Sequence, residues 1–158
     1  CGLRLGEMLA LTPADFNFEK GIVRINKSYQ RIGSEDVITD PKTEKSNRNV
    51  QMPNFLMDEI KEYLDSLYGI EDDQRMFPVT KSYMHNEMSR GSKAAGVKRI
   101  RIHDIRHSHV SLLIEMGFGA VAIADRVGHE SIDITFRYAH LFPTTQQAIA
   151  EQLNLERI

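Results

Sequence analysis

The spacing of apolar residues changes near residue 53, and that change limits the folds this chain can adopt. Between residues 21 and 52 apolar and polar side chains alternate, most clearly in Gly21-Ile22-Val23-Arg24-Ile25, as they do in a half-buried strand. After residue 53 the apolar residues recur every three or four positions, which is the spacing of an amphipathic helix. The first such stripe is Leu56, Ile60, Tyr63, Leu64 and Leu67. The sequence therefore predicts a small sheet followed by helices.

The predicted elements give an α+β fold that is mostly helical, with the helices packed around a small antiparallel three-stranded sheet. Strands are expected at 21–25, 28–32, 37–39 and 50–52, with a turn at Gly33-Ser34 and a polar hairpin or loop at 42–49. Residues 2–11 resemble the end of a helix, and Thr12-Pro13 favours the start of a short one. Further helices are expected at 54–67, 81–95, 105–116, 120–127, 131–138 and 144–155. The apolar stripe expected for the helix over 105–116 is Ile105, His109, Leu112, Leu113 and Met116.

Length and composition indicate one globular domain. The chain has 158 residues, of which 41% are hydrophobic and 27% charged. No apolar run is long enough to span a bilayer, so no membrane partner is expected. The one cysteine, Cys1, excludes an intrachain disulfide and is consistent with a reducing compartment. Because the sequence opens in apparent helix interior without an initiator Met, we expect a fragment whose upstream part is missing.

The charges are distributed unevenly although the formal net charge is only −2. Acidic residues dominate 58–73, and basic residues dominate 81–106. A chain polarised in this way can present one basic face to an anion, although two solvated helices of opposite sign explain the pattern equally well.

His103 and Arg106 form the most specific local pattern. Three residues apart on a helix, they share a face and can reach one bound group. A guanidinium binds two oxygens of a phosphate or carboxylate, and an imidazole can donate, accept or relay a proton. The letters His103-Asp104-Ile105-Arg106-His107 also resemble a zinc-binding helix. The Arg106 charge would repel a metal ion, however, so no metal site is expected.

Two other segments carry candidate site residues. In Gly2-Leu3-Arg4-Leu5-Gly6-Glu7, Arg4 and Glu7 share a helix face, which is also the arrangement of a simple structural ion pair. In residues 127–138, His129 follows a helix-ending glycine and Tyr138 comes a short helix later. Each feature alone has an ordinary structural explanation.

Taken together and in order, these segments resemble the tyrosine recombinase family, the integrases of phages and transposons. Residues 2–7 look like the first arginine box of that family, and Pro41-Lys42-Thr43 looks like its hairpin lysine. Residues 103–107 resemble its H-x-x-R box, and Gly128-His129 with Arg137-Tyr138 resembles its closing histidine and nucleophilic tyrosine. Each motif is weak, but five in register across nearly the whole chain are highly specific.

The resemblance implies a site-specific DNA recombinase or integrase that cleaves and rejoins strands through a covalent 3′-phosphotyrosyl intermediate. Tyr138 would be the nucleophile and His103 the acceptor of its proton. Arg4, Arg106 and His129 would bind the non-bridging phosphate oxygens. Lys42, with Lys45 as the alternative, would protonate the leaving 5′ oxygen, and Glu7 would support the arginines. Neither a metal nor a nucleotide cofactor is expected.

The same resemblance implies double-stranded DNA carrying a recombination site as the partner, and the cytoplasm of a bacterial cell as the compartment. Residues expected to contact the DNA backbone are Lys27, Arg31, Lys45, Arg48, Lys98, Arg99 and Arg101. A homotetramer on DNA is expected, in which the helix from Thr144 onward packs on a neighbouring protomer through Ile149 and Leu153, or folds back on its own domain. The DNA-clamping domain and the first helices of the catalytic domain would lie upstream of Cys1. A type IB topoisomerase-like enzyme, a non-catalytic DNA-binding module and a metal hydrolase built on His103 and His107 remain alternatives.

Overall fold

The computed structural model describes residues 1–41, 43–141, 150 and 153–154. The helices are α1 (Leu5–Leu9), α2 (Asn54–Ser66), α3 (Lys81–Ala94), α4 (Ile102–Glu115), α5 (Ala120–Val127) and α6 (Ile132–Phe136), with short 3₁₀ turns η1 (Pro13–Asp15), η2 (Glu44–Ser46) and η3 (Ala139–Leu141). The strands are β1 (Phe16–Asn17), β2 (Ile22–Ile25), β3 (Ser28–Ile32), β4 (Glu35–Thr39) and β5 (Arg48–Gln51). This confirms the predicted α+β class with a small antiparallel sheet.

The strands form two sheets and not the single one that the sequence suggested. One is three-stranded and antiparallel in the order β1-β2-β5, with Val23 opposite both Phe16 and Val50. The other is the β3–β4 hairpin, which pairs only with itself among the described residues. The separation follows from burial, because Tyr29 of β3 packs in a different apolar cluster from Val23 of β2. Two further details were missed: the two-residue strand β1 was not predicted, and β5 begins at Arg48 inside the predicted loop.

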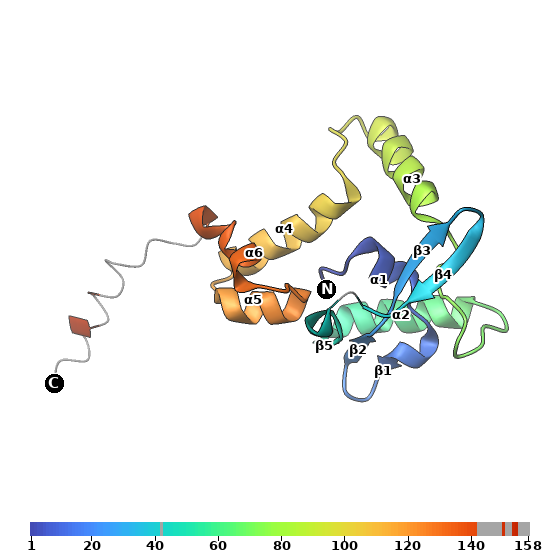
Figure 1. The fold of residues 1–158 in the computed structure, drawn as a ribbon, viewed down its shortest axis with the longest axis horizontal. Coiled ribbons are helices and arrows are strands. Elements are labelled where there is room, and N and C mark those ends of the chain that lie inside the picture. The colour runs from blue at the N-terminus through green and yellow to red at the C-terminus, as the bar shows by residue number, and fades with distance from the viewer. Residues whose placement is uncertain (42, 142–149, 151–152, 155–158) are drawn as a thin grey trace.

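Three apolar clusters hold the elements together. The largest lies between the three-stranded sheet and α2 and includes Val23, Ile25 and Val50. A second joins α1 to β3 through Leu9 and Tyr29, and a third lies between α4 and α5. Figure 1 shows α4, α5 and α6 grouped on one side of the molecule and the sheet with α2 on the other, with α1 between them. The first arginine box on α1 therefore lies where the two groups meet.

Helix α4 buries a different face from the one predicted. Ile105, Leu112 and Met116 are 50%, 51% and 62% exposed, whereas Val110 and Ile114 are buried against α5. The apolar residues of this helix form two stripes, and the sequence alone does not decide which one faces the core. The buried face also carries Arg106, which is 4% exposed. This choice of face points the arginine of the H-x-x-R box inward.

The C-terminal elements agree in part with the prediction. Helix α6 is shorter than the predicted 131–138 and is followed by the turn η3. The predicted helix 144–155, with Ile149, lies almost entirely outside the described residues. None of the helices in the described part of the chain combines the length and apolar character needed to cross a bilayer.

Candidate active site

Arg4 and Glu7 are joined by the start of α1. Arg4 is the N-cap residue, and its extended backbone lets the Glu7 carboxylate, one turn later, accept the Arg4 backbone N–H at 2.9 Å. The same carboxylate accepts Arg4 Nη1 at 2.7 Å. The predicted pair is therefore present, and Glu7 is 5% exposed.

Arg48, at the start of β5, completes this cluster. Its Nη2 donates to Glu7 Oε2 at 3.0 Å, and its Nε donates to the Arg126 carbonyl at 3.0 Å. Its side chain is 7% exposed, so the guanidinium that we expected to contact DNA lies buried beside Glu7. Burial alone would raise the pKa of the Glu7 carboxyl, but hydrogen bonds and charge from Arg48 and Arg4 hold that pKa below its ordinary value.

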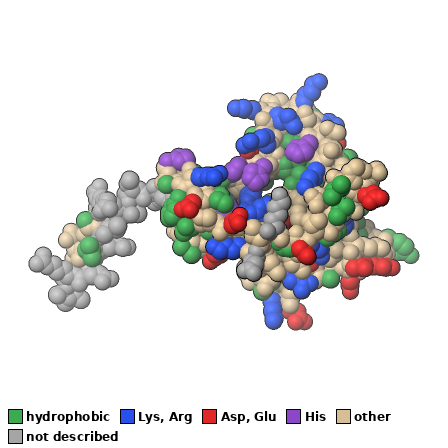
Figure 2. Space-filling view, in the orientation of Figure 1, with side chains coloured by type: hydrophobic (Ala, Val, Ile, Leu, Met, Phe, Trp, Pro, Cys, Tyr) green, Lys and Arg blue, Asp and Glu red, His purple; other side chains and the backbone are tan. Residues whose placement is uncertain are grey.

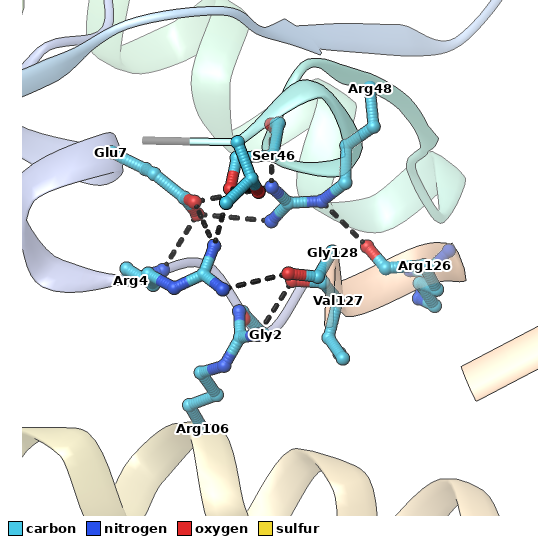
Figure 3. Close-up of polar contacts among 10 residues, drawn as sticks. Gly2, Arg4, Glu7, Ser46, Arg48, Arg106, Arg126, Val127 and Gly128 are labelled. Atoms are coloured by element: carbon cyan, nitrogen blue, oxygen red, sulfur yellow. Dashed lines mark hydrogen bonds and ion pairs between the residues drawn. The ribbon is translucent and has the colours of Figure 1, made fainter. Parts of the chain in front are cut away.

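The two arginines of the predicted phosphate clamp lie side by side (Figure 3). Arg4 Nη2 donates to the carbonyl of Gly128 at 2.7 Å, and Arg106 Nη2 donates to the carbonyl of the preceding Val127 at 2.6 Å. Arg106 Nη1 also donates to the carbonyl of Gly2 at 2.6 Å. Burial, and secondarily the charge of Arg4, lowers the pKa of Arg106 to about 10, so the guanidinium stays charged at neutral pH.

Gly128 allows this close approach. It ends α5 with φ of 68°, in the left-handed region that favours glycine. A Cβ at this position would lie 2.8 Å from Arg48 Nη1 and 3.0 Å from the Lys45 carbonyl. The glycine thus places the next residue, His129, beside the arginines.

His129 is 7% exposed and is held by a residue that the sequence analysis missed. Its Nδ1 lies 2.7 Å from the Oγ1 of Thr135, a fully buried residue of α6. Burial, followed by the charges of Arg106 and Arg4, lowers the pKa of His129 to about 4. The imidazole is therefore neutral at pH 7. The sequence signal that could have revealed Thr135 is its position three residues before Tyr138, about one helical turn away.

Tyr138 reaches the same site after α6. Its backbone N–H donates to the Thr135 carbonyl at 3.0 Å, and its hydroxyl is hydrogen-bonded to Nδ1 of His107. Burial raises the pKa of the phenol, while the charges of Arg106 and Arg137 oppose that rise. His107 had no role in the sequence analysis. The tyrosine contacts this histidine rather than the predicted proton acceptor, His103.

His103 lies one turn earlier on α4, with its ring edge-on to that of His107 at 4.6 Å between centroids. Burial, and then the charges of His107 and Arg106, lowers the pKa of His103. Five residues that the sequence analysis singled out, from three segments far apart in the chain, line one pocket of about 510 Å³. They are Arg4, His103, Arg106, His129 and Tyr138. Figure 2 shows histidine side chains beside Lys and Arg side chains on the face in view.

A neutral histidine, two guanidinium groups and a phenol around one pocket can bind an oxyanion and attack its central atom. This convergence is the opposite of what the non-catalytic alternative required, which was dispersal of the same residues. Among residues 1–41 and 43–141, no group of three His, Cys, Asp or Glu side chains is arranged to hold a metal ion.

Comparison with known proteins identifies the family. Residues 1–145 match the family model described as "Phage integrase family". The chain belongs to the phage integrase family. The resemblance to tyrosine recombinases seen in the sequence is thereby confirmed.

Individual relatives and solved structures of this family agree. The ICEBs1 integrase of Bacillus subtilis (strain 168) is 33% identical over 167 aligned positions, which cover 97% of this chain and 45% of that protein. The Tn1549 transposon integrase in complex with circular intermediate DNA superposes with a TM-score of 0.79 at 22% identity, over 98% of this chain and 56% of that one. The catalytic domain of bacteriophage HP1 integrase gives a TM-score of 0.61 at 20% identity, over 97% and 75%. The chain spans about half the length of the curated integrases it matches.

The remaining predicted residues of this integrase-family chain lie around the pocket or away from it. Lys42 lies outside the described residues, and its alternative Lys45 is exposed on η2. Lys98, Arg99 and Arg101 are exposed between α3 and α4, and Arg101 pairs with Asp104 at 2.8 Å. Lys27 pairs with Asp15 at 2.7 Å, and Arg31 with Asp36 at 3.1 Å.

Proposed function

We propose that this chain is the catalytic domain of a site-specific DNA recombinase or integrase, which cleaves and rejoins DNA through Tyr138. The observation that carries the proposal is the convergence of Arg4, Arg106, His129 and Tyr138 on one pocket. Arg4 lies more than a hundred residues before the other three, yet its guanidinium and that of Arg106 bind the carbonyls of two adjacent residues, Gly128 and Val127.

The reaction needs only side chains. The Tyr138 oxygen forms a bond to phosphorus as the bond from phosphorus to the 5′ oxygen breaks, which leaves a 3′-phosphotyrosine and a free 5′ hydroxyl. The covalent link conserves the energy of the phosphodiester, so a second 5′ hydroxyl can reverse the step without an external energy source. Neither a metal ion nor a nucleotide takes part in this scheme.

Negative charge develops on the non-bridging oxygens in the transition state. Arg4 and Arg106 each use part of their N–H groups on backbone carbonyls, which fixes the guanidinium planes before DNA arrives. Their other N–H groups are donors for the phosphate, and neutral His129 adds one more. Removing one such donor costs about 3 kcal/mol of transition-state stabilisation. Glu7 and Arg48 act through Arg4 by holding it in place.

We assign to Lys42 the role of donating a proton to the leaving 5′ oxygen, with Lys45 as the alternative. A lysine suits this role because its ammonium group carries the proton that the leaving oxygen needs. The sequence-based prediction for the acceptor of the tyrosine proton is His103, which lines the same pocket.

Double-stranded DNA with a recombination site is the proposed partner. The Tn1549 integrase and the XerH recombinase, both similar in fold to this chain, were solved in complex with DNA. We assign the phosphate contacts to the exposed cations Lys45, Lys98, Arg99 and Arg101. Arg101 pairs with Asp104, but its side chain is 79% exposed, whereas Lys27 and Arg31, which also pair with carboxylates, are 24% and 45% exposed and less available. A homotetramer on DNA, joined by the C-terminal helix, and a cytoplasmic location in a bacterial cell stay predictions.

Covalent capture tests the proposal directly. The full-length protein is incubated with a randomised pool of nicked duplexes, on which cleavage releases a short strand and traps the covalent complex. The wild type is expected to form a complex that survives denaturing electrophoresis, and Tyr138→Phe is expected to bind the selected duplex without forming it. Capture by Tyr138→Phe, or no capture by the wild type, would contradict the proposal. Relaxation of supercoiled DNA without exchange of strands between duplexes would favour the topoisomerase-like alternative.

A further inference from the structure

Among the described residues, His107 is the histidine whose side chain is hydrogen-bonded to the proposed nucleophile, and the proposed reaction gives it no task. Its Nδ1 is hydrogen-bonded to the Tyr138 hydroxyl, and the two rings are 5.8 Å apart between centroids. His103, the expected proton acceptor, has no hydrogen bond to that hydroxyl in the structure; its ring contacts the edge of His107 instead.

We propose that His107 is a catalytic residue, whose Nδ1 accepts the phenolic proton of Tyr138 as the tyrosine oxygen attacks phosphorus. This inference rests on the proposed function. As the new O–P bond forms, the O–H bond of the phenol breaks and the proton moves to Nδ1, giving an imidazolium. The 5′ oxygen departs with a proton from the general acid. In the rejoining step the imidazolium returns its proton to the tyrosine.

The fold fixes the two partners independently of each other. His107 lies on α4, one residue after Arg106, whose buried guanidinium is bonded to the carbonyls of Gly2 and Val127. Tyr138 is held from α6 by its backbone bond to Thr135 and packs against the cluster between α4 and α5. The contact between ring nitrogen and hydroxyl is therefore set by elements that are anchored without it.

The charges around this contact suit a base that works on bound DNA. The titratable and charged groups around it are His103, Asp104 and Arg106 on α4, Arg4 at α1, His129 between α5 and α6, Arg137 beside the tyrosine, and His140 on η3. Nearly all of them are cationic or neutral, so a phosphodiester entering the pocket supplies the negative charge that balances a new imidazolium. His103 is then left free to hydrogen-bond the phosphate.

The same contact is compatible with a second role, in which His107 only holds the tyrosine in a resting position. The two roles predict opposite effects of removing the imidazole. Loss of a proton acceptor slows cleavage, typically by about 10²- to 10⁴-fold, whereas loss of a restraint leaves cleavage unchanged or faster.

The test measures the rate of covalent complex formation by the full-length protein on the duplex selected above. His107→Ala is expected to bind that duplex as the wild type does and to cleave it at least about 100-fold more slowly. Added imidazole is expected to restore part of the rate. His107→Asn keeps a polar group near the Nδ1 position but cannot take up the proton, so it is expected to be slow and insensitive to imidazole. His85→Ala, which removes an exposed histidine from α3, is the matched control and keeps the wild-type rate.

A substrate with sulfur in place of the bridging 5′ oxygen separates the two ends of the reaction. Its thiolate leaves without a proton, so it relieves defects in the general acid but not in the acceptor of the tyrosine proton. The His107→Ala defect is expected to persist on it. Full rescue of His107→Ala by this substrate would overturn the role of His107 and leave the proposed function standing. A rate of His107→Ala on the ordinary duplex that equals or exceeds the wild-type rate would do the same. Absence of a covalent complex from the wild type overturns the proposed function itself.

Discussion

Replacing Glu7 by Gln should destabilise the fold more than any exposed charge change, because this carboxylate holds two arginines. The Glu7–Arg48 pair is buried on both sides, with side chains 5% and 7% exposed. Removing one partner of such a pair costs about 3–5 kcal/mol, since the other charge stays buried. Glutamine can still accept one hydrogen bond, so we take the lower value.

The bond to Arg4 adds less, because 37% of the Arg4 side chain is exposed and solvent screens the pair. A screened pair contributes at most about 1 kcal/mol. The expected loss is therefore about 3–4 kcal/mol in the free energy of unfolding, out of about 5–15 kcal/mol for a typical domain.

Urea denaturation at several pH values measures this loss. The folded-state pKa of Glu7 lies below its ordinary value of 4.5, so the stabilisation is present above pH 4.5 and is lost as the pH falls through the folded-state pKa. The difference between wild type and Glu7→Gln should thus be largest at neutral pH and shrink on acidification. Glu87→Gln, which breaks an exposed pair with Arg90, is the control and should leave the denaturation midpoint unchanged. A Glu7→Gln midpoint equal to that of this control would refute the reasoning.

Four other predictions follow from the contacts of the site. Thr135→Val removes the hydroxyl that is hydrogen-bonded to His129 Nδ1 and should slow cleavage by about 10-fold or more. Thr135→Ser keeps the hydroxyl and should preserve both the cleavage rate and the ¹⁵N chemical shifts of the His129 imidazole. Because the folded-state pKa of His129 is about 4 and the ordinary value is 6.5, stability should fall as the pH drops from 6.5 toward 4, and His129→Gln should flatten this slope. Arg48→Met should lower stability by about 3 kcal/mol without changing the salt dependence of DNA binding, while Arg101→Met should reduce that slope by about 0.9. Gly128→Ala should destabilise the chain by about 1–2 kcal/mol from the left-handed backbone alone, and its denaturation midpoint measures this.

The sequence predicted the parts of this molecule that depend on local pattern. The strand β2, the helix α2 and the ends of helices at glycine follow from spacing over a few residues. Arg4, Arg106, His129 and Tyr138 were proposed as site residues from residue types and their order along the chain, and the structure brings them to one pocket.

The parts that were missed depend on contacts between distant segments. Arg48 looked like one more cation in a polar stretch, and its burial is decided by Glu7, 41 residues away. His107 had no assignment because its partner, Tyr138, is 31 residues further on and reaches it only through the packing of α4 and α6. The buried face of α4 likewise could not be chosen between two apolar stripes until α5 was in place.

Mass spectrometry of the covalent protein–DNA complex tests the central claim most directly. After nuclease digestion, we expect a nucleotide linked through its 3′ phosphate to the peptide that carries Tyr138. A nucleotide on any other residue, or complete digestion to unmodified protein, would contradict it.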